Sequence, residues 1–176
     1  SVSSLQACIA DSAGNILIDY RDISKTGTSY TFSLTSAERT TLRKHITSGS
    51  SATVRFYVKT VIGDTTYRSY LSKTLSLVNY TPTLSPTVVD TGSTSTALTG
   101  DPNIVIKGFN VMSVSSGGAA RKNATIKSQK ITCGSKSISS GSGTLSYVDS
   151  GTFKFTITDS RGHTTTKTVT KTLIPY

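Results

Sequence analysis

The sequence has few charged residues and no long apolar run. Charged residues make up 16% and hydrophobic residues 35% of the 176 residues, both below the averages of globular domains. The absence of a long apolar run excludes a membrane-spanning helix. Serine and threonine fill the deficit, and threonine favours the half-buried surface of a β-strand. The chain opens with Ser1 and no signal-peptide pattern, so we expect it to be part of a longer protein.

Cysteine is nearly absent, since only Cys8 and Cys133 occur, one in each half of the chain. A disulfide within either half is therefore excluded. Two isolated cysteines are not typical of a disulfide-stapled secreted scaffold. Cys133 shares its strand parity with Ile131, which predicts a buried thiol that packs as a small hydrophobic side chain.

Acidic residues and histidines are also scarce, with 9 Asp and Glu and 2 His. Seven of the eight aspartates lie in or beside predicted turns, where Asp is favoured for its hydrogen bonds to the backbone. No spacing of His, Cys or carboxylates is typical of a metal site. No nucleophile elbow or phosphate-binding loop occurs either. We therefore expect a protein that is not an enzyme and that uses no cofactor.

The formal net charge is +10, from 19 basic and 9 acidic residues, and both halves of the chain are positive. Such a field attracts anionic polymers. Nucleic acid, anionic cell-wall polymers and acidic membranes are therefore all candidate partners at this point. Nucleic acid is disfavoured because no recognition helix or RNP-like aromatic motif accompanies the charge. The alternative is a solvated basic surface without a ligand.

Residues 54–68, VRFYVKTVIGDTTYR, and residues 153–167, FKFTITDSRGHTTTK, follow the same pattern. In each, three apolar residues alternate with polar ones, and a glycine follows five residues later. Alternation that ends in turn residues predicts a β-hairpin. In this alignment His163 matches Asp64. Two copies of one hairpin indicate two copies of one architectural unit.

The segment NYTPTLSP, residues 79–86, separates the two copies, because proline cannot donate a hydrogen bond to a central strand. We therefore expect two domains, at residues 1–80 and 81–176. Short strands separated by turns dominate both. Such spacing is typical of β-sandwiches, so the predicted fold class is all-β.

The first half is predicted to contain a hairpin over residues 5–20, a strand over residues 29–34 and one short helix over residues 35–46. Thr35 and Glu38 have the spacing of a helix capping box. The second half has about seven predicted strands. Residues 103–114 are expected to form one of them, and the Ser/Thr/Gly-rich stretch 91–100 has no predicted element.

The motif DSGTFKF, residues 149–155, resembles the immunoglobulin-fold corner D-x-G/A-x-Y-x-C. Phe153 replaces the corner tyrosine and Phe155 replaces the second cysteine. Burial of the two rings must therefore stand in for the hydrogen bond and the disulfide bridge of that fold. The resemblance implies two tandem immunoglobulin-like β-sandwich domains, in which the repeated segments are the F–G hairpins.

Two surfaces are candidates for ligand binding. If Val54, Phe56 and Val58 face the core, the intervening residues face outward together. Aromatic faces can then stack on sugar rings, and Arg or Lys can pair with phosphate or carboxylate. The alternative is one core row and one ordinary surface row. The first surface consists of Arg55, Tyr57, Lys59, Tyr67, Arg68 and Tyr70. The second is a basic cluster in the second half, whose members Arg121 and Lys122 lie in a loop that we expect to be exposed. It consists of Arg121, Lys122, Lys127, Lys130 and Lys136.

The runs LQACIADSAGNILIDYRDI, YTFSLTSAERTTLRKHI and GFNVMSVSSGG resemble the immunoglobulin-like modules in tail-tip and antireceptor proteins of siphophages of Gram-positive bacteria, streptococci especially. The resemblance implies a structural protein of the distal virion tail that acts in host attachment. Its expected partners are other tail proteins and a cell-wall glycopolymer such as teichoic acid, and oligomers are open.

No functional residue carries over from this family, because the shared positions are turn and core positions. The modules either contact the wall polymer or act as rigid spacers for a receptor-binding domain elsewhere. The alternative to the viral interpretation is a pair of stalk domains from a bacterial cell-surface adhesin.

Overall fold

The computed structural model describes residues 1–92 and 94–176. The chain divides into two compact units, Ser1–Val78 and Asn79–Tyr176, where the sequence analysis placed a boundary after residue 80. About half of the described residues lie in strands, nearly all of them antiparallel, and the two helices among them are short. The predicted all-β fold class is therefore confirmed.

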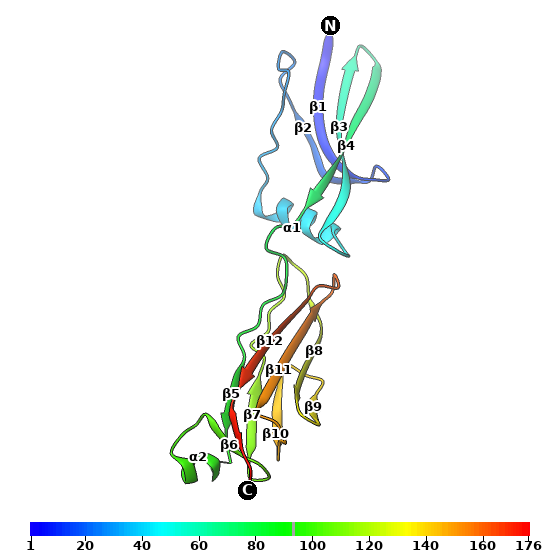
Figure 1. Cartoon of the computed structure of the whole chain (residues 1–176). Helices are drawn as coiled ribbons and strands as arrows, with labels where there is room; N and C mark the ends of the chain where they lie inside the picture. Colours follow the sequence, from blue (N-terminus) through cyan, green and yellow to red (C-terminus); the bar gives the residue numbers. More distant parts are fainter. Residues whose placement is uncertain (93) are drawn as a thin grey trace. The chain divides into compact units, whose positions relative to one another are not determined.

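The first unit is a single antiparallel sheet that packs against one helix (Figure 1). The sheet has the order β2-β1-β3-β4. Its strands are β1 (Val2–Asp11), β2 (Ile16–Asp22), β3 (Ser51–Ile62) and β4 (Thr65–Ser76). The predicted β-sandwich is wrong for this unit, because its strands form one sheet and not two packed sheets. The predicted strand over residues 29–34 is also wrong, since that segment pairs with no strand.

Helix α1 (Ser36–His45) follows the predicted capping box, which is confirmed. The Glu38 N–H donates to the Thr35 hydroxyl at 3.2 Å, and the Thr35 N–H donates to the Glu38 carboxylate at 2.8 Å. Arg21 of β2 also forms an ion pair with Glu38, which ties the start of the helix to the sheet. Leu42 is buried against Ile9, Ile18 and Val54, which are the core of this unit.

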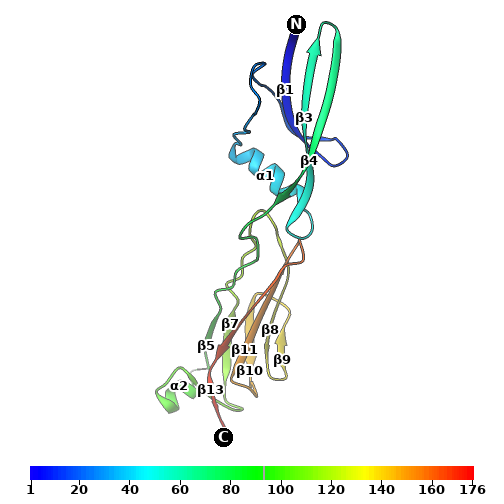
Figure 2. The ribbon, with the colours of Figure 1, turned by 45° about the horizontal axis from the view of Figure 1, so that its top comes forward.

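The second unit has two larger antiparallel sheets (Figures 1 and 2). One has the order β10-β7-β5 and the other β12-β11-β8-β9. The strands of the first are β5 (Thr87–Asp90), β7 (Val111–Ser115) and β10 (Ser142–Ser146). The strands of the second are β8 (Ile126–Cys133), β9 (Lys136–Ile138), β11 (Thr152–Asp159) and β12 (Thr164–Thr170). Side chains from both sheets meet in one core.

The second unit also contains elements that the sequence analysis did not resolve. Residues 103–114 form two strands, because a turn at Gly108, whose φ is 81°, separates β6 (Ile104–Ile106) from β7. Strand β6 pairs in parallel with β13 (Thr172–Ile174). A short helix, α2 (Thr94–Thr99), lies in the stretch with no predicted element. A single sequence shows too little periodicity in three-residue strands for these to be separated.

The core of the second unit is built around the aromatic pair of β11. Phe153, Phe155 and Ile157 are fully buried, as their alternation on one face predicts. Cys133 of β8 lies opposite Phe153 and is also buried, so the prediction of a packed thiol is confirmed. Each fully buried side chain of this size contributes about 1.5–3 kcal/mol, so this group is a main source of the unit's stability.

Both predicted copies of the hairpin form, as β3–β4 and β11–β12, but their loops differ. The β3–β4 loop has only two residues, Gly63 and Asp64. Gly63 has a φ of 57°, as the first position of a type II′ turn requires. The β11–β12 loop is longer and has its left-handed residue at Gly162, with a φ of 91°. The alignment of His163 with Asp64 therefore joins positions in two different turns.

The β11–β12 loop has its structural match in the β1–β2 loop, over Asp11-Ser-Ala-Gly-Asn15. One carboxylate oxygen of Asp11 accepts the N–H groups of Ala13 and Asn15 at 2.8 and 2.9 Å. The equivalent oxygen of Asp159 accepts those of Arg161 and His163, both at 2.9 Å. The shared pattern Asp-Ser-x-Gly-x is thus a second internal repeat, one that the comparison of hairpins missed.

We expect the substitution Phe155→Ala to destabilise the second unit by about 3–5 kcal/mol, because it removes a fully buried ring and leaves a cavity. Native-state hydrogen exchange should show faster exchange of the amides of β11, β8 and β12. The amides of β3 should keep their protection, because Phe155 belongs to the core of the second unit alone. Lys154→Ala, an exposed neighbour on β11, is the control. Equal exchange in the two variants would contradict this account of the core.

Candidate functional site

The register of β3 and β4 brings five of the predicted site residues together on one sheet face. Tyr57 lies opposite Tyr70, and Lys59 lies opposite Arg68. Arg55 is two residues from Tyr57 and therefore on the same face. Cross-strand partners have neighbouring side chains, so aromatic and basic groups alternate over this surface. We call these five residues the aromatic–cationic cluster.

The opposite face of the sheet is covered only in part. Val54 is buried and Phe56 is half-buried, but Val58 is 37% exposed, so the prediction that all three face a core is wrong for Val58. Tyr67 lies on this opposite face, because its parity differs from that of Arg68 and Tyr70, and it does not join the cluster. The incomplete cover leaves a groove of about 520 Å³ between the sheet and the segment that contains Phe32.

Cations lie over aromatic rings within the cluster. The Arg55 guanidinium lies over the Tyr70 ring, with its central carbon 4.3 Å from the ring centroid. Arg55 Nη1 also donates to the Tyr57 hydroxyl at 3.2 Å, and this hydrogen bond raises the pKa of Arg55. The Tyr57 and Tyr70 rings are 5.1 Å apart and tilted. Each cation–π contact contributes about 0.5–1 kcal/mol at an exposed site.

Tyr20 of β2 belongs to the same surface, although the sequence analysis missed it. Lys59 Nζ is 4.3 Å from the centroid of the Tyr20 ring, and the Arg68 guanidinium is 5.9 Å from it. Burial raises the pKa of Tyr20, and its hydrogen bond with Cys8 raises it further. Tyr20 is two strands away from β3 in the sheet order, so only the pairing of β2 with β1 reveals its place.

The cations of the cluster have no carboxylate partner. Within residues 1–92 and 94–176, no carboxylate oxygen lies within 4.0 Å of Arg55, Lys59 or Arg68. The carboxylate of Asp11 is engaged by the N–H groups of its own loop, and the Asn15 side chain and these N–H groups lower its pKa. The three cations are therefore not paired directly with a carboxylate among the described residues, although the charge of Asp11 acts on Arg55 from a longer distance.

A small cavity of about 90 Å³ lies beneath the cluster. It is lined by Cys8, Gly14, Ile16, Tyr20, Tyr57 and Arg68. Gly14 permits this close approach, because a Cβ atom there would lie 3.2 Å from the Tyr57 hydroxyl and because its φ of 95° disfavours other residues. Burial raises the pKa of the Cys8 thiol, which lowers the fraction of reactive thiolate.

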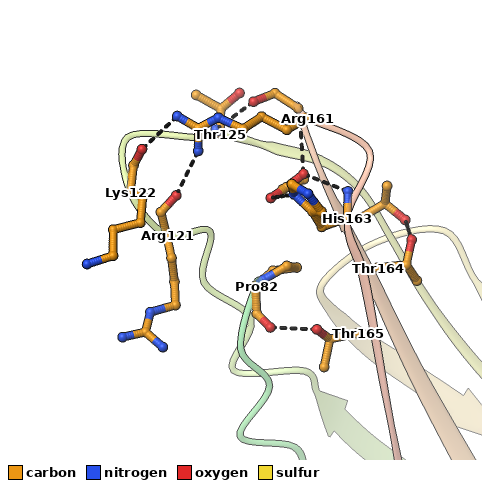
Figure 3. A network of polar contacts seen from close by, with 11 residues as sticks. Pro82, Arg121, Lys122, Thr125, Arg161, His163, Thr164 and Thr165 are labelled. Atoms are coloured by element: carbon orange, nitrogen blue, oxygen red, sulfur yellow. Dashed lines mark hydrogen bonds and ion pairs between the residues drawn. The ribbon is translucent and has the colours of Figure 1, made fainter. Parts of the chain in front are cut away.

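The second predicted surface, Arg121 and Lys122, belongs to the second unit (Figure 3). Arg161 holds this loop, because its guanidinium donates to the carbonyl oxygens of Arg121 at 3.3 Å and Lys122 at 2.7 Å. Lys122 and the next residue, Asn123, have positive φ values of 54° and 64°. In Figure 3 the two basic side chains point away from Arg161. Arg121 is exposed and Lys122 is half-buried.

Asp159 organises the loop that carries Arg161. It is fully buried, and its second carboxylate oxygen is 3.2 Å from His163 Nδ1. Burial alone would raise the pKa of Asp159, but the hydrogen bonds from His163 and Arg161 lower it below its usual range. The centroid of the His163 ring also lies 4.5 Å from the centroid of the Tyr80 ring. This histidine therefore has a role in the fold of the second unit.

No protein-family model and no curated protein matches this chain. In the part of the chain that the structure describes, no group of three or more His, Cys, Asp or Glu side chains is placed to hold a metal ion. No helix in the same residues is long and apolar enough to cross a membrane.

We expect the thiol of Cys133 to be nearly inert in the native protein. Burial raises its pKa to about 11, so only about one thiol in a thousand is ionised at pH 8. In a Cys8→Ser variant, the remaining thiol should react with a disulfide reagent more than about a hundredfold slower than free cysteine. Addition of denaturant should restore the normal rate. Fast reaction without denaturant would show that this core position is open to solvent.

We expect Asp159→Asn to lower the free energy of unfolding by about 1.5–3 kcal/mol at pH 7, because it removes charge-assisted hydrogen bonds. A carboxylate with a lowered folded-state pKa stabilises above its unfolded pKa, about 4, and loses this effect as the pH falls through the folded pKa. The difference between the variant and the parent protein should therefore shrink below pH 4. Asp64→Asn, in the two-residue loop, is the control with little expected change. A difference that is constant from pH 7 to pH 2 would refute the assignment.

Proposed function

We propose that this chain is a non-enzymatic attachment module that contacts an anionic glycopolymer of a bacterial cell wall. The observation that supports this proposal most directly is the aromatic–cationic cluster of the first unit. Its three cations share one sheet face and have no carboxylate partner among the described residues. Such a surface attracts polyanions, and clustered Arg and Lys side chains pair with phosphate or carboxylate.

The two cysteines support binding over nucleophilic catalysis. Both are buried in packed sheets. A nucleophile requires exposure and a lowered pKa, whereas burial raises the pKa of Cys8 and Cys133. The two thiols therefore fit a protein that acts through its surface charge better than one that acts through a cysteine nucleophile.

We propose in addition that the second unit is immunoglobulin-like. The order β12-β11-β8-β9 matches the G-F-C-C′ order of an immunoglobulin sheet, and β10-β7-β5 matches E-B-A. The buried Phe153 and Phe155 on β11 then occupy the corner and cysteine positions of strand F. The first unit does not share this proposal, since it has one sheet.

We place the module at the distal tail of a virion that attacks Gram-positive cells, with other tail proteins as neighbours. The support for this placement is the resemblance of its sequence runs to siphophage tail-tip modules. In this setting the first unit makes the wall contact, and the second unit is a spacer or a further contact surface through Arg121 and Lys122. The module acts at the host cell surface.

We expect the chain to bind Gram-positive cell walls saturably, and to bind less when wall teichoic acid is removed. The triple variant Arg55→Ala, Lys59→Ala, Arg68→Ala should bind at least about tenfold more weakly. The matched control is Lys107→Ala, Lys154→Ala, Lys167→Ala, which removes the same charge from exposed positions of the second unit outside both candidate surfaces. Binding should be measured over a salt series by sedimentation of walls.

Equal losses in the two triple variants would show that net charge alone drives adsorption. Binding no tighter than that of an equally basic unrelated protein would reduce the first unit to a spacer. Either result overturns the proposed wall contact.

A further inference from the structure

The tyrosines of the cluster hold its cations in place. Arg55 lies over the Tyr70 ring, and Lys59 and Arg68 lie near the Tyr20 ring. Tyr70 also has the Tyr57 ring against it at 5.1 Å. Arg55 is further restrained by its hydrogen bond to the Tyr57 hydroxyl. Each long basic side chain is thus restrained by aromatic groups and not by a carboxylate.

This arrangement disfavours a stacking platform. Single-stranded nucleic acids and sugars bind to sheet surfaces through aromatic faces that are open to the ligand. Here Tyr70 and Tyr20 have cations over their rings, and Tyr57 packs against Tyr70. Tyr70 is 52% exposed, so its ring is covered only in part, and a ligand there also meets the cations beside it. Because each cation is already restrained, less side-chain entropy is lost when an anion binds.

The cations form two separate points of charge. The Cα atoms of Arg55 and Lys59 are about 13 Å apart along β3. Their charged groups lie over rings of different strands, Arg55 over Tyr70 of β4 and Lys59 over Tyr20 of β2. Arg68 lies opposite Lys59 and 5.9 Å from the Tyr20 ring, so these two cations form one point of charge and Arg55 forms the other. A ligand that engages both points must carry at least two anionic groups.

We propose that the cluster recognises a linear polymer whose phosphodiester groups are joined by polyol or sugar units, and that it does so by the spacing of charge. Tyr20 and Tyr70 are positioning residues in this proposal, and Arg55, Lys59 and Arg68 contact the phosphates. The proposal rests on the proposed function, since it names the ligand class of the same surface. Nucleic acid is the competing polyanion, and the test includes it.

The first test is a length series of defined glycerol-phosphate oligomers, with affinity measured by calorimetry on the full chain. A single repeat unit reaches one charge point only, and longer oligomers reach both. We expect a steep gain in affinity at the length that first reaches both points of charge, and a gradual change beyond it. In Arg55→Ala the steep gain should vanish. A single-stranded oligonucleotide of equal charge should bind no more tightly than the matching glycerol-phosphate oligomer.

The second test separates positioning from contact. Tyr70→Phe keeps the ring under Arg55 and should bind the long oligomer as the parent protein does. Tyr70→Leu removes the ring and should bind about two- to fivefold more weakly, the loss of one exposed cation–π contact. Tyr67→Leu is the matched control, since Tyr67 is 57% exposed on the opposite face, and it should change nothing. Amide exchange of β3 and β4 verifies that each variant is folded.

The outcomes distinguish the two proposals. Absence of saturable binding to wall polymer overturns the proposed function and this inference with it. Saturable binding without a length threshold, or with Tyr70→Leu equal to Tyr70→Phe, overturns this inference alone. Tighter binding of the oligonucleotide than of the charge-matched polymer would show that the rings stack on bases, and would overturn the assignment of the tyrosines as positioning residues.

Discussion

The unbroken pairing of β3 with β4, from Ser51 opposite Ser76 to Ile62 opposite Thr65, is the constraint on which the candidate site depends. A slip of one residue would move the side chains of one strand to the other face of the sheet. Tyr70 would then lose Tyr57 as its neighbour. The two-residue loop with Gly63 in the left-handed region sets this register. This turn therefore determines which side chains of β3 and β4 lie next to one another in the cluster.

The shortage of acidic residues has a direct electrostatic consequence. Asp11 and Asp159 use their carboxylates to close hairpin loops, and Glu38 uses its carboxylate to cap helix α1 and pair with Arg21. Carboxylates that serve backbone N–H groups in this way are not free to neutralise basic side chains elsewhere. The cations of β3 and β4 are restrained by tyrosine rings instead. Tyrosine rings can thus order the basic side chains of a positive surface in place of carboxylates.

The same hairpin pattern serves two different architectures. In the second unit, the apolar side of β11 is fully covered because a second sheet packs against it. In the first unit, the corresponding side of β3 packs against helix α1 and the segment with Phe32, and Val58 is left 37% exposed. Periodicity reports which side of a strand is apolar. It does not report what will cover that side, which is why the predicted sandwich of the first unit was wrong.

The sequence by itself determined the all-β class, both hairpins, the capped helix at Thr35 and the burial of Phe153, Phe155 and Cys133, because strand alternation and helix capping are local patterns. It also determined that Arg55, Tyr57 and Lys59 share a face. Tertiary structure alone placed Tyr20 beneath Lys59, set Tyr70 opposite Tyr57 and, within the described residues, left the three cations without a carboxylate within 4.0 Å. These features depend on strand order and register between segments distant in the chain, and local periodicity contains no information on either.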